Sequence, residues 1–334
     1  MNVKEEYDFF VKNRCNLMYL DTSKLTNVIL YSELFSKILP IKFHDFSNVT
    51  NIDYLFYNKK LSDSDLSFLD ISSVTSAECT FCENSCEVLI DDWNTSKLRN
   101  TKSIFERAVF NSCLSDWDTS NIKNSSCMFY ECKNNKLNVK NWNMSNCENM
   151  DEMFYNSECN NDIYYWDISK CKTLRYTFAS CIVPSFSLYL DTSSVRNMHG
   201  TFRNSYSDED LNMNFWDTSN CNNMVATFSG YMRAEGDKDD SIPSNNLMLE
   251  YWDISSVKNM NEMFCHNDYV KIYVSDWNTS EVKNIRNLLL NSSAEVSSLE
   301  DWYYVENHAN FLWGSKYLKD GKFSESFAKN YKLN

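Results

Sequence analysis

Apolar and polar residues recur along this chain with a period of about two dozen positions. The clearest marker is a Trp followed by Asp or Asn and, at the third position after it, by Ser, as in Trp117-Asp118-Thr119-Ser120. With the Trp counted as position 0, copies of the pattern start at Leu20, His44, Leu69, Trp93, Trp117, Trp142, Trp166, Leu190, Trp216, Trp252, Trp277 and Trp302. Successive copies start 24–26 residues apart, except for one step of 36 residues between Trp216 and Trp252. Such a period predicts a stack of similar supersecondary units.

Two periodicities inside each copy predict its local structure. Positions −5 and −3 are apolar, for example Leu247 and Leu249, and this alternation predicts a short strand. Positions +5, +8, +11 and +12 are apolar, with Phe at +12 in nine copies, and this spacing predicts a short helical turn. The Ser at +3 is expected to cap that turn through its hydroxyl. The Asp or Asn at +1 and the Asn at +7 are expected to bond turn backbone with their side chains.

These expectations combine into an α/β solenoid that is leucine-rich-repeat-like. It has one parallel β-sheet face, short helical turns on the opposite wall, and about twelve repeats of 24–25 residues. Residues 1–16 are predicted to form an N-terminal cap, residues 17–302 the repeat solenoid, and residues 303–334 a C-terminal cap, because the terminal apolar faces of a stack need cover. The long step predicts a surface insertion at 229–246. Its acidic run leaves calcium binding open as an alternative to a solvated loop.

One copy displays a pattern that resembles a known family. The stretch Trp252-Asp253-Ile254-Ser255-Ser256-Val257-Lys258-Asn259-Met260-Asn261-Glu262-Met263-Phe264 looks like the repeats of the BspA-like leucine-rich-repeat surface protein family. This family includes mycoplasma lipoprotein-type repeats and relatives in protists and large DNA viruses. The resemblance covers roughly residues 17–302 and implies a repeat scaffold. For bacterial members it implies surface attachment and protein binding.

Charge and hydropathy narrow the classes of partner. Lys and Arg total 32 against 46 Asp and Glu, a net charge of −14, which opposes nucleic acid because phosphate binding draws on clustered Lys and Arg. No run approaches the roughly 18 apolar residues that a membrane span needs. The first residues carry acids where a secretory signal has a basic and then an apolar segment. We therefore expect protein partners, no nucleic acid, no membrane span, and an intracellular or virion location, with the cell surface as the alternative.

Catalytic and cofactor chemistry finds little support in the sequence. The four His are scattered over the copies, and five Gly are too few to build a phosphate-binding loop. The thiols of Cys79, Cys82 and Cys86 have a spacing that suits zinc, but other copies hold single cysteines in the same slots, which favours wall residues. We expect no enzyme, no catalytic residue, no metal and no cofactor, and cysteines that pack as small apolar residues more often than they form disulfides.

Position −1, directly before the Trp, is the most informative variable position. It changes from acidic or amide to aromatic and back, in the order Asp92, Asp116, Asn141, Tyr165, Tyr189, Phe215, Tyr251, Asp276 and Asp301. We predict that strand alternation turns this position outward, and that a protein partner binds the sheet face there at Tyr164, Tyr165, Tyr189, Phe215, Tyr251 and Tyr273. The alternative is that the aromatic side chains fold inward and stack as another ladder.

These observations together favour one class of function. The sequence predicts a non-catalytic repeat scaffold for protein–protein interaction, which serves as a structural or assembly component, for example of a large DNA virus particle. The alternative is a cell-surface adhesin of the BspA-like type.

Overall fold

The computed structural model describes residues 26–27, 45–59, 66–67, 69–84, 88–134, 137–157, 163, 166–181, 189–205, 210–230, 246–267, 271–274, 276–297 and 299–333. They belong to two compact units, Met1–Cys147 and Glu148–Asn334. The boundary between the units falls inside the stretch predicted to be one continuous solenoid. The predicted N-terminal cap and residues 231–245 of the predicted insertion lie outside the described residues.

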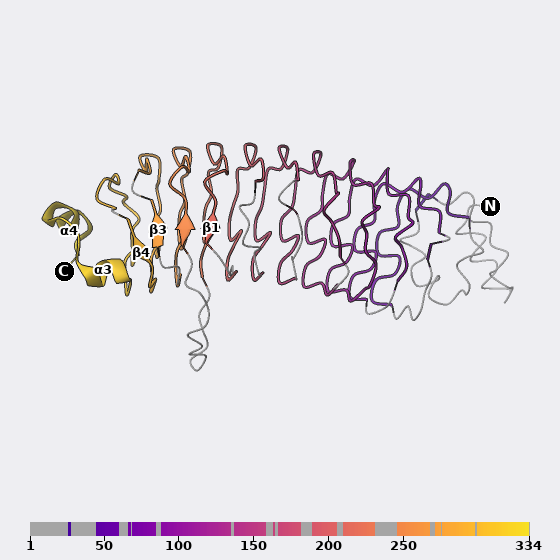
Figure 1. Cartoon of the computed structure of the whole chain (residues 1–334), viewed down its shortest axis with the longest axis horizontal. Coiled ribbons are helices and arrows are strands. Elements are labelled where there is room, and N and C mark those ends of the chain that lie inside the picture. The colour runs from indigo at the N-terminus through magenta and orange to yellow at the C-terminus, as the bar shows by residue number, and fades with distance from the viewer. Residues whose placement is uncertain are drawn as a thin grey trace. The chain divides into compact units, whose positions relative to one another are not determined.

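The second unit contains a parallel sheet of four short strands, in the order β1-β2-β3-β4 (Figure 1). The strands are β1 Leu211–Asn212, β2 Leu247–Met248, β3 Lys271–Tyr273 and β4 Glu295–Val296. The residues at position −5 pair in register, since Leu211 lies opposite Leu247 and Leu247 lies opposite Ile272. All three side chains are buried. The parallel sheet predicted upstream of the Trp is therefore confirmed in these copies.

A second line of parallel pairing runs through position +7. In the first unit the paired residues are Asn27, Asn51, Ser76, Asn100 and Asn124, and in the second unit they are Asn149, Thr173, Asn197, Asn223, Asn259 and Asn284. Asn284 also pairs with Asn307, which lies at position +5 of the last copy. Side-chain amides at this position also bond their own turn. The Asn223 Oδ1 atom accepts from the Val225 N–H at 3.2 Å, and the Asn259 Oδ1 atom accepts from the Asn261 N–H at 3.1 Å. The role predicted for Asn at +7 is confirmed in these copies.

The helical turns predicted after the Trp are wrong for the described copies. The segment from +8 to +15 consists of successive β-turns, each closed by a bond from an N–H to the carbonyl three residues before it. The Arg203 N–H donates to the Gly200 carbonyl, and the Ser205 N–H donates to the Phe202 carbonyl. The intervening N–H groups donate to the next copy instead, as from Phe202 to the Thr227 carbonyl at 2.8 Å. Positions +10 and +14 are left-handed, with φ of 63° at Gly200 and 56° at Asn204. A right-handed helix excludes both features, so the three-residue apolar spacing arises from turns.

The α-helices of the described residues lie near the C-terminus. Helix α3 spans Lys316–Asp320 and helix α4 spans Glu325–Tyr331 (Figure 1). Each helix begins after a Ser whose hydroxyl accepts a hydrogen bond from the backbone N–H of the third helical residue. Ser315 accepts from Leu318, and Ser324 accepts from Phe327. Tyr317, Phe327 and Tyr331 are buried. These apolar side chains place both helices against the preceding part of the second unit.

Aromatic side chains at positions +12 and 0 fill the core of each unit. In the first unit the Phe56, Phe81, Phe105 and Phe129 rings stack in sequence with centroids 5.4–5.7 Å apart. In the second unit the series Phe154, Phe178, Phe202, Phe228 and Phe264 has spacings of 5.5–6.0 Å. Between described residues, the indole N–H of six Trp residues at position 0 donates to a carbonyl of the preceding copy, as from Trp252 to the Met213 carbonyl at 2.8 Å. Ring stacking at position +12 and the indole hydrogen bond at position 0 therefore both join neighbouring copies.

The capping role predicted for the Ser at +3 is also corrected. The side chain at +1 is the acceptor, since Asp217 Oδ1 takes the Ser219 N–H at 3.0 Å and Asp253 Oδ1 takes the Ser255 N–H at 2.9 Å. Asn replaces Asp without loss of the contact, as between Asn278 and Ser280. This local side-chain bond fixes the corner after the Trp. It confirms the role predicted for the Asp or Asn at +1.

Candidate functional site

Three of the predicted binding residues are exposed side chains in consecutive copies of the second unit. Tyr189 is 58% exposed, Phe215 54% and Tyr251 80%, and we call these three residues the aromatic patch. The inward ladder considered as an alternative does not hold for them.

A turn exposes the aromatic patch. The N–H of Trp216 donates to the Met213 carbonyl at 3.1 Å, and the N–H of Trp252 donates to the Leu249 carbonyl at 3.1 Å. These bonds close a turn from position −3 to position 0, so the side chains at −2 and −1 lie at its tip. Strand alternation, the reason argued from the sequence, is wrong, because with positions −5 and −3 buried it would also bury position −1 and expose the Trp at position 0. The turn instead exposes position −1 and leaves the Trp buried.

Tyr189 and Phe215 line an open groove of about 360 Å³. Their ring centroids are 4.6 Å apart and their planes are inclined at 45°. The other lining residues are Leu190, Asp191, Thr192 and Asp217. The Thr192 hydroxyl donates to the Asp217 carbonyl at 2.9 Å, which ties together the two copies that form the groove. The groove is thus a property of adjacent copies rather than of either copy alone.

Two carboxylates stand beside these rings. Asp217 Oδ1 accepts both the N–H and the hydroxyl of Ser219, and these hydrogen bonds lower the pKa of the Asp217 carboxyl. Asp191 Oδ1 accepts the Ser193 N–H at 3.0 Å. No Lys or Arg among the described residues forms an ion pair with either carboxylate. The groove therefore combines two aromatic faces with two carboxylates that have no cationic partner in the described part of the chain.

The remaining predicted residues have different surroundings. Tyr273 lies in β3 and is half-buried, so it contributes less surface than the aromatic patch. Tyr164 and Tyr165 lie outside the described residues. The Tyr251 N–H donates to Asn214 Oδ1 at 3.2 Å, and the Asn214 amide donates to Glu250 at 2.8 Å, which fixes the turn that carries Tyr251. Asp276 and Asp301, the next residues at position −1, are exposed acids.

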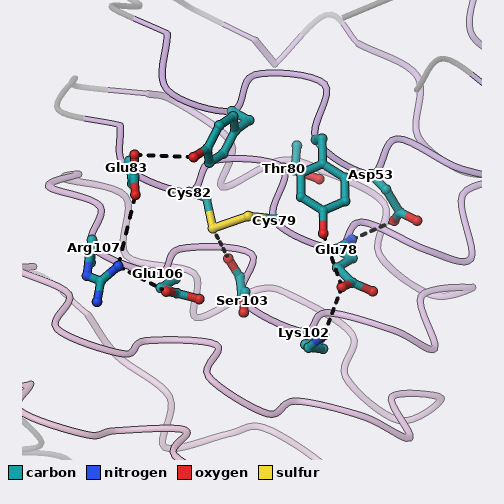
Figure 2. The surroundings of a disulfide bond; sticks show 12 residues. Asp53, Glu78, Cys79, Thr80, Cys82, Glu83, Lys102, Ser103, Glu106 and Arg107 are labelled. Carbon is teal, nitrogen blue, oxygen red and sulfur yellow. Dashed lines mark hydrogen bonds and ion pairs between the residues drawn. A yellow bond between two sulfur atoms is a disulfide. The ribbon is translucent and has the colours of Figure 1, made fainter. Parts of the chain in front are cut away.

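Cys79 and Cys82 form a disulfide in the first unit (Figure 2). They occupy positions +10 and +13, which the turn bond from the Cys82 N–H to the Cys79 carbonyl brings together, with a Cα–Cα distance of 4.8 Å. The sequence reading of these two cysteines as wall residues or zinc ligands is corrected, because it did not anticipate that the turn joins these positions. Cys86 lies outside the described residues. Among the residues that are described, no group of three or more His, Cys, Asp and Glu could hold a metal ion.

Charged side chains near the disulfide pair across copies. Lys102 Nζ lies 3.0 Å from Glu78, and Arg107 Nε lies 3.0 Å from Glu131. The Glu78–Lys102 pair and Arg107 are drawn around the disulfide in Figure 2. Here acids are matched by bases in the next copy, in contrast to the groove.

One contact between a Tyr and a His escaped the sequence analysis. The Tyr176 hydroxyl lies 3.0 Å from His199 Nε2, and the two side chains come from adjacent copies. Burial lowers the pKa of His199, and the nearby Arg175 and Arg203 lower it further. No signal for this contact was present in the sequence, because the register that brings position +10 of one copy beside position +9 of the next, as in the bond from the Tyr176 N–H to the His199 carbonyl, is seen only in the structure.

The two ladders of parallel pairing and the aromatic stacks define a repeat protein with a parallel sheet and few helices. The sequence matches the family described as "Mycoplasma protein of unknown function, DUF285" over residues 23–109, 80–188, 157–240, 186–302 and 240–320. Because these matches together run from residue 23 to residue 320, the chain belongs to this family. The match is consistent with the mycoplasma-type repeats that the sequence resembles. No curated protein and no solved structure matches the chain.

The described part of the chain has no helix with both the length and the apolar character of a membrane span.

Proposed function

We propose that this protein is a non-catalytic repeat scaffold that binds another protein along its sheet face, and that its copies form a leucine-rich-repeat-like solenoid of about twelve repeats. The carrying observation is the aromatic patch, whose three side chains are more than half exposed in consecutive copies. Large exposed aromatic side chains that gather on one surface are typical of protein-contact sites. A scaffold built into a larger assembly, such as a virus particle, would use this face as its contact.

Affinity capture with the intact chain tests this proposal. The test variant is Tyr189→Ser/Phe215→Ser/Tyr251→Ser, and the matched control is Asp92→Ser/Asp116→Ser/Asn141→Ser, which changes the same position in three copies of the first unit. We expect the test variant to lose partners that the control and the unchanged chain retain, as measured by quantitative mass spectrometry. An identical partner list for all three proteins would contradict the proposal.

One observation favours the second candidate, a cell-surface adhesin. The Cys79–Cys82 disulfide is of a kind that persists in oxidising environments, such as the exterior of a cell. Labelling of intact cells with a membrane-impermeant reagent decides between the two candidates. An adhesin is labelled, whereas recovery of only unlabelled protein from the cell interior excludes the adhesin.

A further inference from the structure

We propose that the groove lined by Tyr189, Phe215 and the carboxylates of Asp191 and Asp217 receives a Lys or Arg side chain, and that the partner is an extended, basic segment of a protein. This inference rests on the proposed function and names the chemistry of the partner. It follows from three properties of the surface: the composition of the groove, its unbalanced charge, and the exposed acids in the next copies.

The composition of the groove suits a long cationic side chain. The Tyr189 and Phe215 rings contact each other with their planes inclined at 45°, and Asp191 and Asp217 line the same groove. A Lys or Arg side chain packs its methylene groups on aromatic rings and places its charged end over a ring face or against a carboxylate. A volume of about 360 Å³ admits one such side chain with water around it.

The charge of the groove is not balanced within the described chain. Some carboxylates near copy boundaries have cationic partners, as Glu78 has Lys102 and Asp151 has Arg175. Asp191 and Asp217 form no ion pair with any described Lys or Arg. The hydrogen bonds from Ser219 favour the ionised form of Asp217. A cation supplied from outside would pair with these carboxylates as Lys102 pairs with Glu78.

The acidic character of the surface continues beyond the groove. Asp253 and Asp276, in the next copies, are both exposed. A partner segment with several Lys or Arg residues can therefore meet carboxylates in more than one copy.

A glycan is the other occupant that aromatic side chains and carboxylates can bind. The two rings do not form a flat stacking platform, because their planes are inclined. The polar side-chain groups of the groove are two carboxylates and the hydroxyls of Tyr189 and Thr192, and the Thr192 hydroxyl already donates to a backbone carbonyl. This leaves the Tyr189 hydroxyl as the side-chain donor for sugar hydroxyls, whereas both carboxylates can pair with a cation, so the observations favour the cation.

Titration of the full-length chain with synthetic peptides tests the inference. The probes are two ten-residue peptides, alternating Lys and Ser and alternating Glu and Ser. We expect the alternating Lys peptide to bind at least about tenfold more tightly than the alternating Glu peptide. Equal affinity for the two peptides, or no binding of the Lys peptide, would overturn the inference.

Two variants and a matched control locate the site. Tyr189→Ser/Phe215→Ser removes the rings, and Asp191→Asn/Asp217→Asn removes the charges. Asn retains the corner bond, as it does at Asn278. Each variant is expected to weaken binding of the alternating Lys peptide about tenfold or more. Asp70→Asn/Asp118→Asn removes equal charge at the same position in the first unit, and an equal loss of binding in this control would overturn the inference.

The outcomes also separate this inference from the proposed function. Loss of captured partners in the patch variant, together with no peptide binding, would overturn the cationic segment and leave the protein-binding scaffold standing. Failure of both tests would reject both proposals. Binding of neutral oligosaccharides that the Tyr189→Ser/Phe215→Ser variant loses, without peptide binding, would assign the groove to a glycan and overturn the inference.

Discussion

Replacement of Phe202 by Leu tests whether neighbouring copies stabilise each other through the Phe stack. Phe202 is 2% exposed, and its ring centroid lies 5.5 Å from those of Phe178, Phe228 and Trp216. An aromatic pair contributes about 0.5–1.5 kcal/mol beyond the area that it buries. Leu keeps much of the apolar area but loses three ring contacts, so we expect the free energy of unfolding to fall by about 2–4 kcal/mol. Urea denaturation followed by Trp fluorescence measures this change.

A double-mutant comparison shows whether the loss arises from coupling. Phe202→Leu combined with Phe228→Leu changes two rings in contact, whereas Phe178→Leu combined with Phe264→Leu changes two rings separated by two copies. We expect the adjacent pair to depart from additivity by about 0.5–1.5 kcal/mol, and the separated pair to add within about 0.5 kcal/mol. Tyr251→Leu, on an exposed side chain, is expected to change stability by less than about 0.5 kcal/mol. Strict additivity for both pairs would refute the nearest-neighbour picture.

Three further predictions concern the corner, the disulfide and a glycine. Hydrogen bonds from Ser219 lower the folded-state pKa of Asp217. The contribution of Asp217 to stability is therefore complete above the ordinary carboxyl pKa of about 4 and is lost as the pH falls through the lowered value. Between pH 7 and pH 2 the urea midpoint should fall less for Asp217→Asn than for the unchanged chain. Reduction of the Cys79–Cys82 disulfide, which closes a loop of four residues, should lower the free energy of unfolding by about 2 kcal/mol in urea, and a Cys79→Ser/Cys82→Ser variant should not respond to the reductant. Gly200→Ala should lower the free energy of unfolding by about 1–3 kcal/mol, because its Cβ would lie 2.3 Å from a Tyr176 ring carbon. The backbone itself accepts Ala, since Ala226 occupies the same position in the next copy with φ of 52°. Thermal denaturation should therefore show most of the loss removed in a Tyr176→Ser background.

The repeat and its strand could be read from the sequence, but the wall opposite the sheet could not. Positions −5 and −3 alternate cleanly, and a parallel strand is the simple consequence of stacking them, as Leu211, Leu247 and Ile272 show. Apolar residues three positions apart fit a helix and a series of β-turns equally well. The left-handed backbone at +10 and +14 distinguishes the two structures. Glycine is the usual sequence signal for left-handed backbone, and among these positions only residue 200 is a glycine. Glu152 and Glu262 adopt the same conformation because the surrounding hydrogen bonds hold it.

The candidate site was located by its pattern but not by its contacts. The change from acid to aromatic at position −1 identified Tyr189, Phe215 and Tyr251, and all three are exposed. The acids at +1 were interpreted only as turn formers, and Asp191 and Asp217 belong to the same groove as the rings. A turn that folds position +1 back beside position −1 of a neighbouring copy is tertiary information, which one copy of the pattern does not contain. The same limit applied to Cys79 and Cys82.

The 36-residue step shows how this protein tolerates changes in its length. Across that step Asn223 still pairs with Asn259, and the Trp216 and Trp252 rings stack at 6.5 Å, close to the 6.4 Å of the next pair. Extra residues between two copies therefore leave the register of their neighbours intact. Because each copy bonds to the one before it and the one after it, gene duplication or deletion of a whole copy preserves every type of contact. Unequal recombination within such a gene would produce longer and shorter proteins that fold by the same rules, and selection could adjust the reach of the binding face by changing copy number alone.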